Sequence, residues 1–79
     1  MPITALLFAK YRTVAGQKEF QIEYSDGATV RQVASCLEEK IQDLELTGAL
    51  CALNESYTSP DTVVADGDTI AFLPPVSGG

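Results

Sequence analysis

The stretch TVRQVASCLEEKI, residues 29–41, is the best-marked structural element of the sequence. Thr29 and Gln32 have the spacing of a capping box, in which a hydroxyl accepts a backbone amide of the first helical turn. Apolar side chains then recur at helical spacing and form one narrow stripe, so an α-helix is predicted here that lies across a sheet with its outer side in water. The stripe consists of Val30, Val33, Ala34, Leu37 and Ile41.

The segments on either side of this helix predict strands. Residues 3–9 and 69–73 are short apolar runs with β-branched and aromatic members, and residues 19–24 alternate apolar and polar side chains at the period of a strand. Shorter candidates are 50–53 and an edge strand at 63–64, while residues 10–16 predict a short helical turn. The order β, β, α, β, β predicts an α+β roll: a mixed sheet of four to five strands with one main helix packed on one face.

The first and last predicted strands are apolar on both of their faces, although one helix covers only one face of a sheet. The opposite face is therefore expected to expose an apolar patch near the end of the chain, and such patches commonly mark protein interfaces. The candidate interface residues are Phe8, Phe72 and Leu73.

The length of the chain limits the number of domains, and its charge limits the kinds of partner. A chain of 79 residues allows a single domain spanning 1–79. Its net charge of −6 disfavours nucleic acid and anionic membranes as partners, because both are recognised mainly by cationic side chains. No apolar run approaches the roughly 20 residues that cross a bilayer, and no signal peptide is evident, so a cytoplasmic protein is expected.

The sequence offers few groups for catalysis. It contains no histidine, which removes the usual Ser/His and Cys/His nucleophile pairs and the common zinc sites. Cys36 and Cys51 are expected to be reduced thiols, and Asp66 with Asp68 predicts a hairpin turn. We therefore expect no metal site, no bound cofactor and no enzyme that acts alone.

The last six residues, PPVSGG, follow the final predicted strand directly. Two prolines stiffen the exit, and two glycines make a slim tip that could enter a narrow channel of another protein. The α-carboxylate of Gly79 is ionised at neutral pH and could attack the α-phosphate of ATP. Residues 74–79 are thus a candidate functional tail, and the structural alternative is a frayed chain end.

The stretch DGDTIAFLPPVSGG, residues 66–79, closely resembles the C-terminus of the small, sulfur-carrying subunits of molybdopterin synthase. Three further segments are similar to that family: LLFA at 6–9 followed by Arg12 and Gly16, Thr29-Val30, and ALN at 52–54. The resemblance implies a ubiquitin-like β-grasp fold and a heterotetramer of two small and two large subunits.

The resemblance also implies a chemistry for the tail. A ubiquitin-activating-type adenylyltransferase would consume ATP to adenylate Gly79, and a sulfur donor protein would then supply the sulfur of a thiocarboxylate. The tail would enter the large subunit and donate this sulfur to cyclic pyranopterin monophosphate. An acidic surface of the chain is expected to meet a basic rim around that substrate pocket. The residues that would lie in the channel are Pro74, Pro75, Val76, Ser77 and Gly78.

Two other functions remain open. Carriers for other sulfur pathways, of the thiamin or tRNA-thiolation type, also end in Gly-Gly, although residues 74–77 favour the molybdopterin subunit. The second alternative is a β-grasp interaction module whose tail is never activated. Blocking Gly79 would separate them, because a carrier would lose all function and an interaction module would keep its binding.

Overall fold

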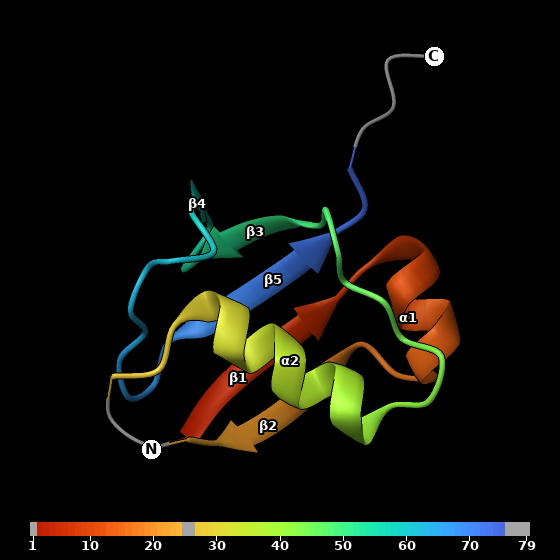
Figure 1. The fold of residues 1–79 in the computed structure, drawn as a ribbon, viewed down its shortest axis with the longest axis horizontal. Helices are drawn as coiled ribbons and strands as arrows, with labels where there is room; N and C mark the ends of the chain where they lie inside the picture. Colours follow the sequence, from red (N-terminus) through yellow and green to blue (C-terminus); the bar gives the residue numbers. More distant parts are fainter. Residues whose placement is uncertain (1, 25–26, 76–79) are drawn as a thin grey trace.

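The computed structural model describes residues 2–24 and 27–75. Five strands form one sheet in the order β2-β1-β5-β3-β4, in which β1 and β5 are parallel and the other neighbours are antiparallel. The helix α2 crosses one face of this sheet, and the short helix α1 lies at one end of it (Figure 1). The predicted α+β roll with a mixed sheet is therefore confirmed. The elements are β1 (Pro2–Leu7), α1 (Ala9–Ala15), β2 (Glu19–Glu23), α2 (Val30–Lys40), β3 (Leu50–Leu53), β4 (Ser56–Thr58) and β5 (Thr69–Leu73).

The capping box fixes where α2 begins. The hydroxyl of Thr29 accepts the N–H of Gln32 at 3.2 Å, and the side-chain oxygen of Gln32 accepts the N–H of Thr29 at 2.8 Å. At the start of a helix these two N–H groups have no backbone acceptor within the helix. Each of the two hydrogen bonds therefore satisfies a donor that would otherwise lack a partner. Ile41, expected as the last member of the stripe, is the C-cap residue.

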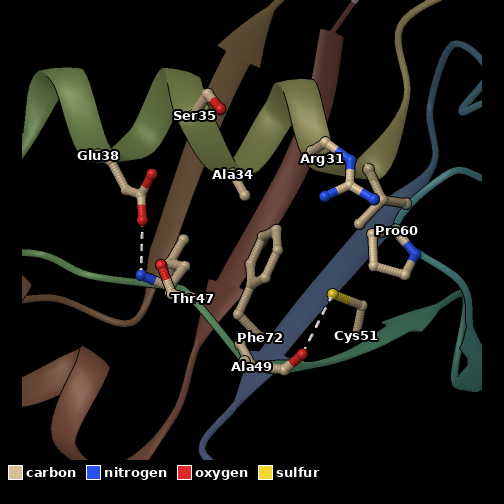
Figure 2. Close-up of a pocket in the computed structure, with 12 residues that line it drawn as sticks. Arg31, Ala34, Ser35, Glu38, Thr47, Ala49, Cys51, Pro60 and Phe72 are labelled. Atoms are coloured by element: carbon tan, nitrogen blue, oxygen red, sulfur yellow. Dashed lines mark hydrogen bonds between the residues drawn. The ribbon is translucent and has the colours of Figure 1, made fainter.

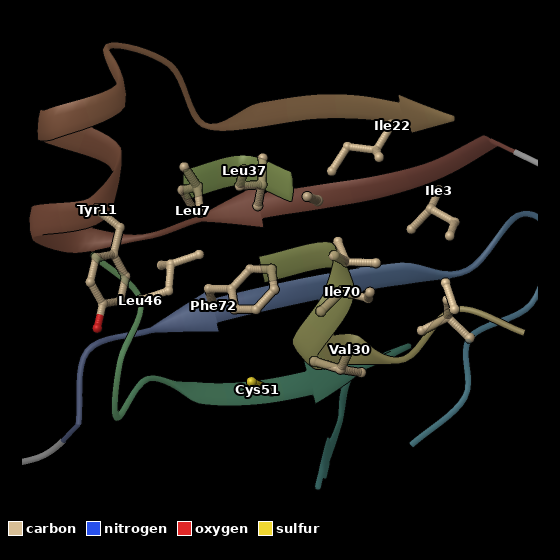
Figure 3. Close-up of a cluster of buried hydrophobic side chains, with 14 of the residues drawn as sticks. Ile3, Leu7, Tyr11, Ile22, Val30, Leu37, Leu46, Cys51, Ile70 and Phe72 are labelled. Atoms are coloured by element: carbon tan, nitrogen blue, oxygen red, sulfur yellow. The ribbon is translucent and has the colours of Figure 1, made fainter. Parts of the chain in front are cut away.

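The core lies between α2 and the covered face of the sheet (Figure 3). Phe72 is at its centre on β5, where Leu7 of β1 and Cys51 of β3 are its neighbours in register. Burying one such aromatic side chain contributes roughly 1.5–3 kcal/mol to stability. The largest fully buried side chains are Phe72, Ile3, Leu7, Ile22, Leu37, Ile70, Val30, Val33 and Val64.

Two local predictions need correction. The strand predicted at 3–9 ends at Leu7, because Ala9 has φ 52 and starts α1. The edge strand predicted at 63–64 is a single bridge between Val63 and Thr29. In addition, no element is predicted for residues 43–49, yet Leu44 and Leu46 there are buried in the core.

The two central strands end at the same edge of the sheet because they are parallel. At this edge the N–H of Phe8, just after β1, donates to the carbonyl oxygen of Phe72 at 3.2 Å. α1 packs there against both β1 and β5. No helix within residues 2–24 and 27–75 is long and apolar enough to span a membrane.

Candidate functional site: the tail base and the open sheet face

The candidate tail begins at the edge of the sheet where β5 ends. β5 lies between β1 and β3, so Leu73 has Leu50 as its register neighbour on β3. Beyond it, Pro74 is half-buried and Pro75 is exposed. The expectations for Val76, Ser77, Gly78 and Gly79 fall outside the described residues.

The face of the sheet opposite α2 carries a row of apolar side chains. Leu6 on β1, Ala71 on β5, Ala52 on β3 and Tyr57 on β4 are successive register partners and cross four strands. The first three are half-buried, and Tyr57 is 74% exposed. The apolar patch expected on the face without the main helix is therefore present, and we call it the open face.

A shallow hollow of about 440 Å³ lies on the open face, between the row of apolar side chains and the turn after β3. Phe8 contributes to its wall, and the Nζ atom of Lys18 lies 4.9 Å from the centre of the Phe8 ring. The hollow thus has an apolar floor and a cation beside it. Its lining residues are Leu6, Phe8, Ala52, Asn54, Glu55, Thr69 and Ala71.

The structure divides the three residues expected at a partner interface. Phe72 is wrongly placed among them, because its side chain points under α2 and has no exposed surface. Leu73 has the opposite orientation, since successive side chains of a strand point to opposite faces, and it is half-buried. Phe8 is also half-buried and borders the open face.

A second hollow of about 430 Å³ lies between α2, residues 46–49 and β3 (Figure 2). The thiol of Cys51 points to the carbonyl oxygen of Ala49, 3.8 Å away, and Glu38 accepts the N–H of Leu46 at 2.6 Å. Burial raises the pKa of the Cys51 thiol, which keeps it protonated and weakly nucleophilic near neutral pH. The sequence contains no histidine that could accept the proton of this thiol.

Possible metal-binding side chains are scattered over the described residues. Within 2–24 and 27–75, no cluster of three or more His, Cys, Asp or Glu side chains has the arrangement of a metal site. Asp68 instead accepts the N–H of Ala65 at 2.7 Å and so closes the predicted turn before β5. The most developed feature for an interaction is therefore the open face beside the tail base.

Comparison with known proteins places the chain in a family. The model of the ThiS family matches residues 5–79. The chain belongs to the ThiS family. This ThiS-family chain is 39% identical to the molybdopterin synthase sulfur carrier subunit of Chlamydomonas reinhardtii, over the full length of both chains.

Solved structures agree with the assignment of the ThiS-family chain. The putative molybdopterin converting factor subunit 1 of Pyrococcus furiosus superposes with a TM-score of 0.81 at 26% identity, covering 96% of this chain and 99% of the other. A chain from the complex of subunits 1 and 2 of the Helicobacter pylori molybdopterin-converting factor gives a TM-score of 0.63 at 28% identity, with all of both chains covered. The fold is thus the ubiquitin-like β-grasp, as the resemblance implied.

Some residues of the open face were missed in the sequence. Tyr57 lies in no element predicted from the sequence, and Ala52 lies in the strand candidate 50–53, to which no interface role was given. Their place in the apolar row follows from the pairing of β3 with β4 and of β3 with β5. The signal was the alternation within these strands, but a strand of three residues, Ser56–Thr58, is too short to give a readable period.

Proposed function

We propose that this chain is the sulfur carrier subunit of a molybdopterin synthase and works in the cytoplasm. The observation that carries the proposal is the position of β5. This central strand ends beside the open apolar face and continues directly into the proline-containing tail. The full-length similarity to a sulfur carrier subunit of Chlamydomonas reinhardtii supports the same function.

The tail is activated at the carboxylate of Gly79. A carboxylate oxygen attacks the α-phosphorus of ATP on an adenylyltransferase, pyrophosphate leaves, and an acyl-adenylate forms. A sulfide-level sulfur from a donor protein then adds to the acyl carbon, and AMP leaves with the oxygen that joined it to the acyl group. The product is a thiocarboxylate, a soft nucleophile that needs no side-chain thiol. This suits a chain whose Cys51 is buried and held as a thiol.

The large subunit then receives the thiocarboxylate. The tail enters its active site, and the thiocarboxylate sulfur forms a carbon–sulfur bond with cyclic pyranopterin monophosphate. A carbon–oxygen bond at the same carbon breaks, and its oxygen leaves with the bonding electrons and takes up a proton. Water later hydrolyses the acyl–sulfur bond and restores the carboxylate of Gly79. The acid–base groups and the phosphate-binding groups lie on the large subunit, which agrees with the lack of histidine in this chain.

The open face docks on the large subunit and sets the direction of the tail. Leu6, Phe8 and Leu73 supply apolar area next to the tail base, and Tyr57 extends the contact to the far strand. Aromatic side chains are enriched at the centres of protein interfaces, and Tyr57 is the most exposed large apolar side chain described. The Helicobacter pylori chain, which was solved in a complex with subunit 2, supports this type of partner.

A reconstituted reaction tests the proposal. The chain is incubated with adenylyltransferase, ATP and a sulfur donor, and is then mixed with the large subunit and cyclic pyranopterin monophosphate. Formation of molybdopterin is the expected result. Deletion of Gly79 is expected to abolish product without lowering the thermal unfolding temperature, because the tail follows the last strand of the sheet.

The same experiment separates the other functions. A chain that acquires sulfur but yields no molybdopterin with an active large subunit would be a carrier for another sulfur pathway. A chain that binds the large subunit but never acquires sulfur would be an interaction module. Either result would contradict the proposed function.

A further inference from the structure

The cationic side chains of this acidic chain are concentrated in its first 18 residues. This segment contains three of the five Lys and Arg residues and none of the eleven Asp and Glu residues. The remainder is therefore strongly anionic. An uneven distribution of this kind matters for association, because complementary fields orient two proteins before they touch.

The fold places the three cationic residues of this segment at the end of the sheet where the tail begins. Lys10 and Arg12 belong to α1, which packs against the ends of β1 and β5 (Figure 1). Lys18 follows α1, and its carbonyl oxygen accepts the N–H of Leu7 at 2.7 Å. All three cationic side chains are exposed, and we call Lys10, Arg12 and Lys18 the cationic edge.

The cationic edge is not neutralised within the described part of the chain. An ion pair in that part joins Arg31 on α2 to Asp61 in the loop after β4, and it does not involve the cationic edge. The Nζ atom of Lys18 lies over the ring of Phe8 at 4.9 Å, and that of Lys10 lies 5.7 Å from the ring centre of Tyr11. Aromatic faces hold cations in place without cancelling their charge, so both ammonium groups stay available for a carboxylate.

The helix α1 also carries an exposed apolar side chain and a shallow hollow. Val14 on α1 is 46% exposed, and a separate shallow hollow at the same helix is lined by Ala9, Arg12, Thr13 and Gly16. Phe8 links this surface to the open face, because its ring lies beneath Lys18 and also borders the hollow there. The cationic edge is thus continuous with the proposed docking surface.

We infer that the cationic edge is a docking site for a cluster of carboxylates on the large subunit. Nucleic acid and anionic bilayers fit less well, since the net charge of −6 repels an extended polyanion. A few carboxylates on a partner act only within about 8 Å at physiological salt, so they sense the edge rather than the whole chain. At this end of the molecule, a basic surface of the chain would meet an acidic surface of the partner. This is the opposite of the expected contact between an acidic surface of the chain and a basic rim of the partner.

The inference rests on the proposed function and assigns a charge to the partner's contact. Its test is the affinity of the full chain for the purified large subunit, measured by titration calorimetry at low and high salt. Lys10→Glu/Lys18→Glu reverses two charges of the edge, and Arg31→Glu/Lys40→Glu makes the same change in net charge on α2. We expect about tenfold weaker binding for the edge variant at low salt, a smaller loss at high salt, and little change for the α2 variant.

A variant with neutral side chains tests the effect of removing the two charges without reversing them. Lys10→Gln/Lys18→Gln is expected to bind with intermediate affinity, and thermal unfolding verifies that each variant is folded. Equal losses in the edge and α2 variants would reveal a general effect of net charge and overturn the inference. Unchanged binding of the edge variant would also overturn it. Failure of the unaltered chain to bind the large subunit would contradict the proposed function itself, and the inference with it.

Discussion

Asn54 and Asp68 join the turn after β3 to the start of β5 through a side-chain hydrogen bond of 3.0 Å. The amide oxygen of Asn54 also accepts the N–H of Thr69 at 3.0 Å, and Asp68 accepts the N–H of Ala65 at 2.7 Å. This network fixes the beginning of the strand that ends at the tail. It explains why an asparagine follows β3, at a residue that also has a positive φ of 49°.

Replacement of Asn54 by alanine is expected to lower the free energy of unfolding by about 1–2 kcal/mol. The variant loses both side-chain hydrogen bonds and places a less tolerant residue in the left-handed region. Urea unfolding followed by circular dichroism measures the change. Asn54→Gly is the control, because it also lacks both side-chain hydrogen bonds but adopts a positive φ without strain, so it should lose less. Equal stability of Asn54→Ala and the unaltered chain would show that the network is not stabilising.

Glu55 is the second residue of the turn that joins β3 to β4, and it has φ 75°. Two residues with positive φ are typical of a tight hairpin in which Asn-Gly is favoured. Glu55→Gly is therefore expected to raise the free energy of unfolding by about 1 kcal/mol, since glycine adopts this conformation without strain. Glu55→Ala keeps the strain and should give no comparable gain. A Gly variant no more stable than the Ala variant would contradict this reading of the turn.

Phe72 and Leu73 are neighbours on β5 with opposite roles. Phe72→Ala should lower the free energy of unfolding by about 3–5 kcal/mol, because it leaves a cavity under α2. If that variant does not fold, the smaller change Phe72→Leu should still be destabilising. Leu73→Glu should cost no more than about 1 kcal/mol, but it should weaken binding to the large subunit. Urea unfolding measures the change in stability, and calorimetric titration measures the change in binding. A large loss of stability for Leu73→Glu, with a loss of binding alone for Phe72→Ala, would contradict the assignment of Phe72 to the core and Leu73 to the open face.

Two buried titratable groups predict that stability falls at alkaline pH. Burial raises the pKa of Cys51, and burial together with the nearby Cys51 raises that of Tyr11. The folded state therefore holds these protons more tightly than the unfolded state, whose thiol titrates near pH 8.5. Their contribution is complete below that pH and is lost as the pH rises through the folded-state values.

The measurement for this prediction is the free energy of unfolding from pH 7 to pH 11, which should fall as the pH rises. Cys51→Ala is expected to reduce the fall in stability between about pH 8.5 and pH 10. A slope that is identical in the Cys51→Ala variant and the unaltered chain would rule out a contribution from Cys51.

The parts of the fold that local sequence determines were predictable. Thr29 and Gln32 identified the start of α2 because a capping box is formed by residues close in sequence. The last strand, at 69–73, has the predicted bounds, since a turn precedes it and two prolines follow it. The open face was predictable as well, because one helix cannot cover two apolar faces.

The remaining features depend on tertiary contacts. Ala9 takes φ 52° to turn the chain from β1 into α1, although alanine has no intrinsic preference for that region. Leu46 is buried with its N–H on Glu38, a bond between residues eight positions apart that no local pattern announces. The face to which Phe72 points was ambiguous because β5 is apolar on both sides, and only its pairing with Leu7 and Cys51 decides it.

The most direct test of the carrier function is the intact mass of the chain with its own C-terminus, after incubation with adenylyltransferase, ATP and a sulfur donor. We predict a mass increase that corresponds to the replacement of one oxygen by one sulfur, and fragmentation should locate it at Gly79. The variant that lacks Gly79 should show no increase. An unchanged mass of the full chain, with partners that are active on another carrier, would contradict the carrier function and leave the tail as a docking segment.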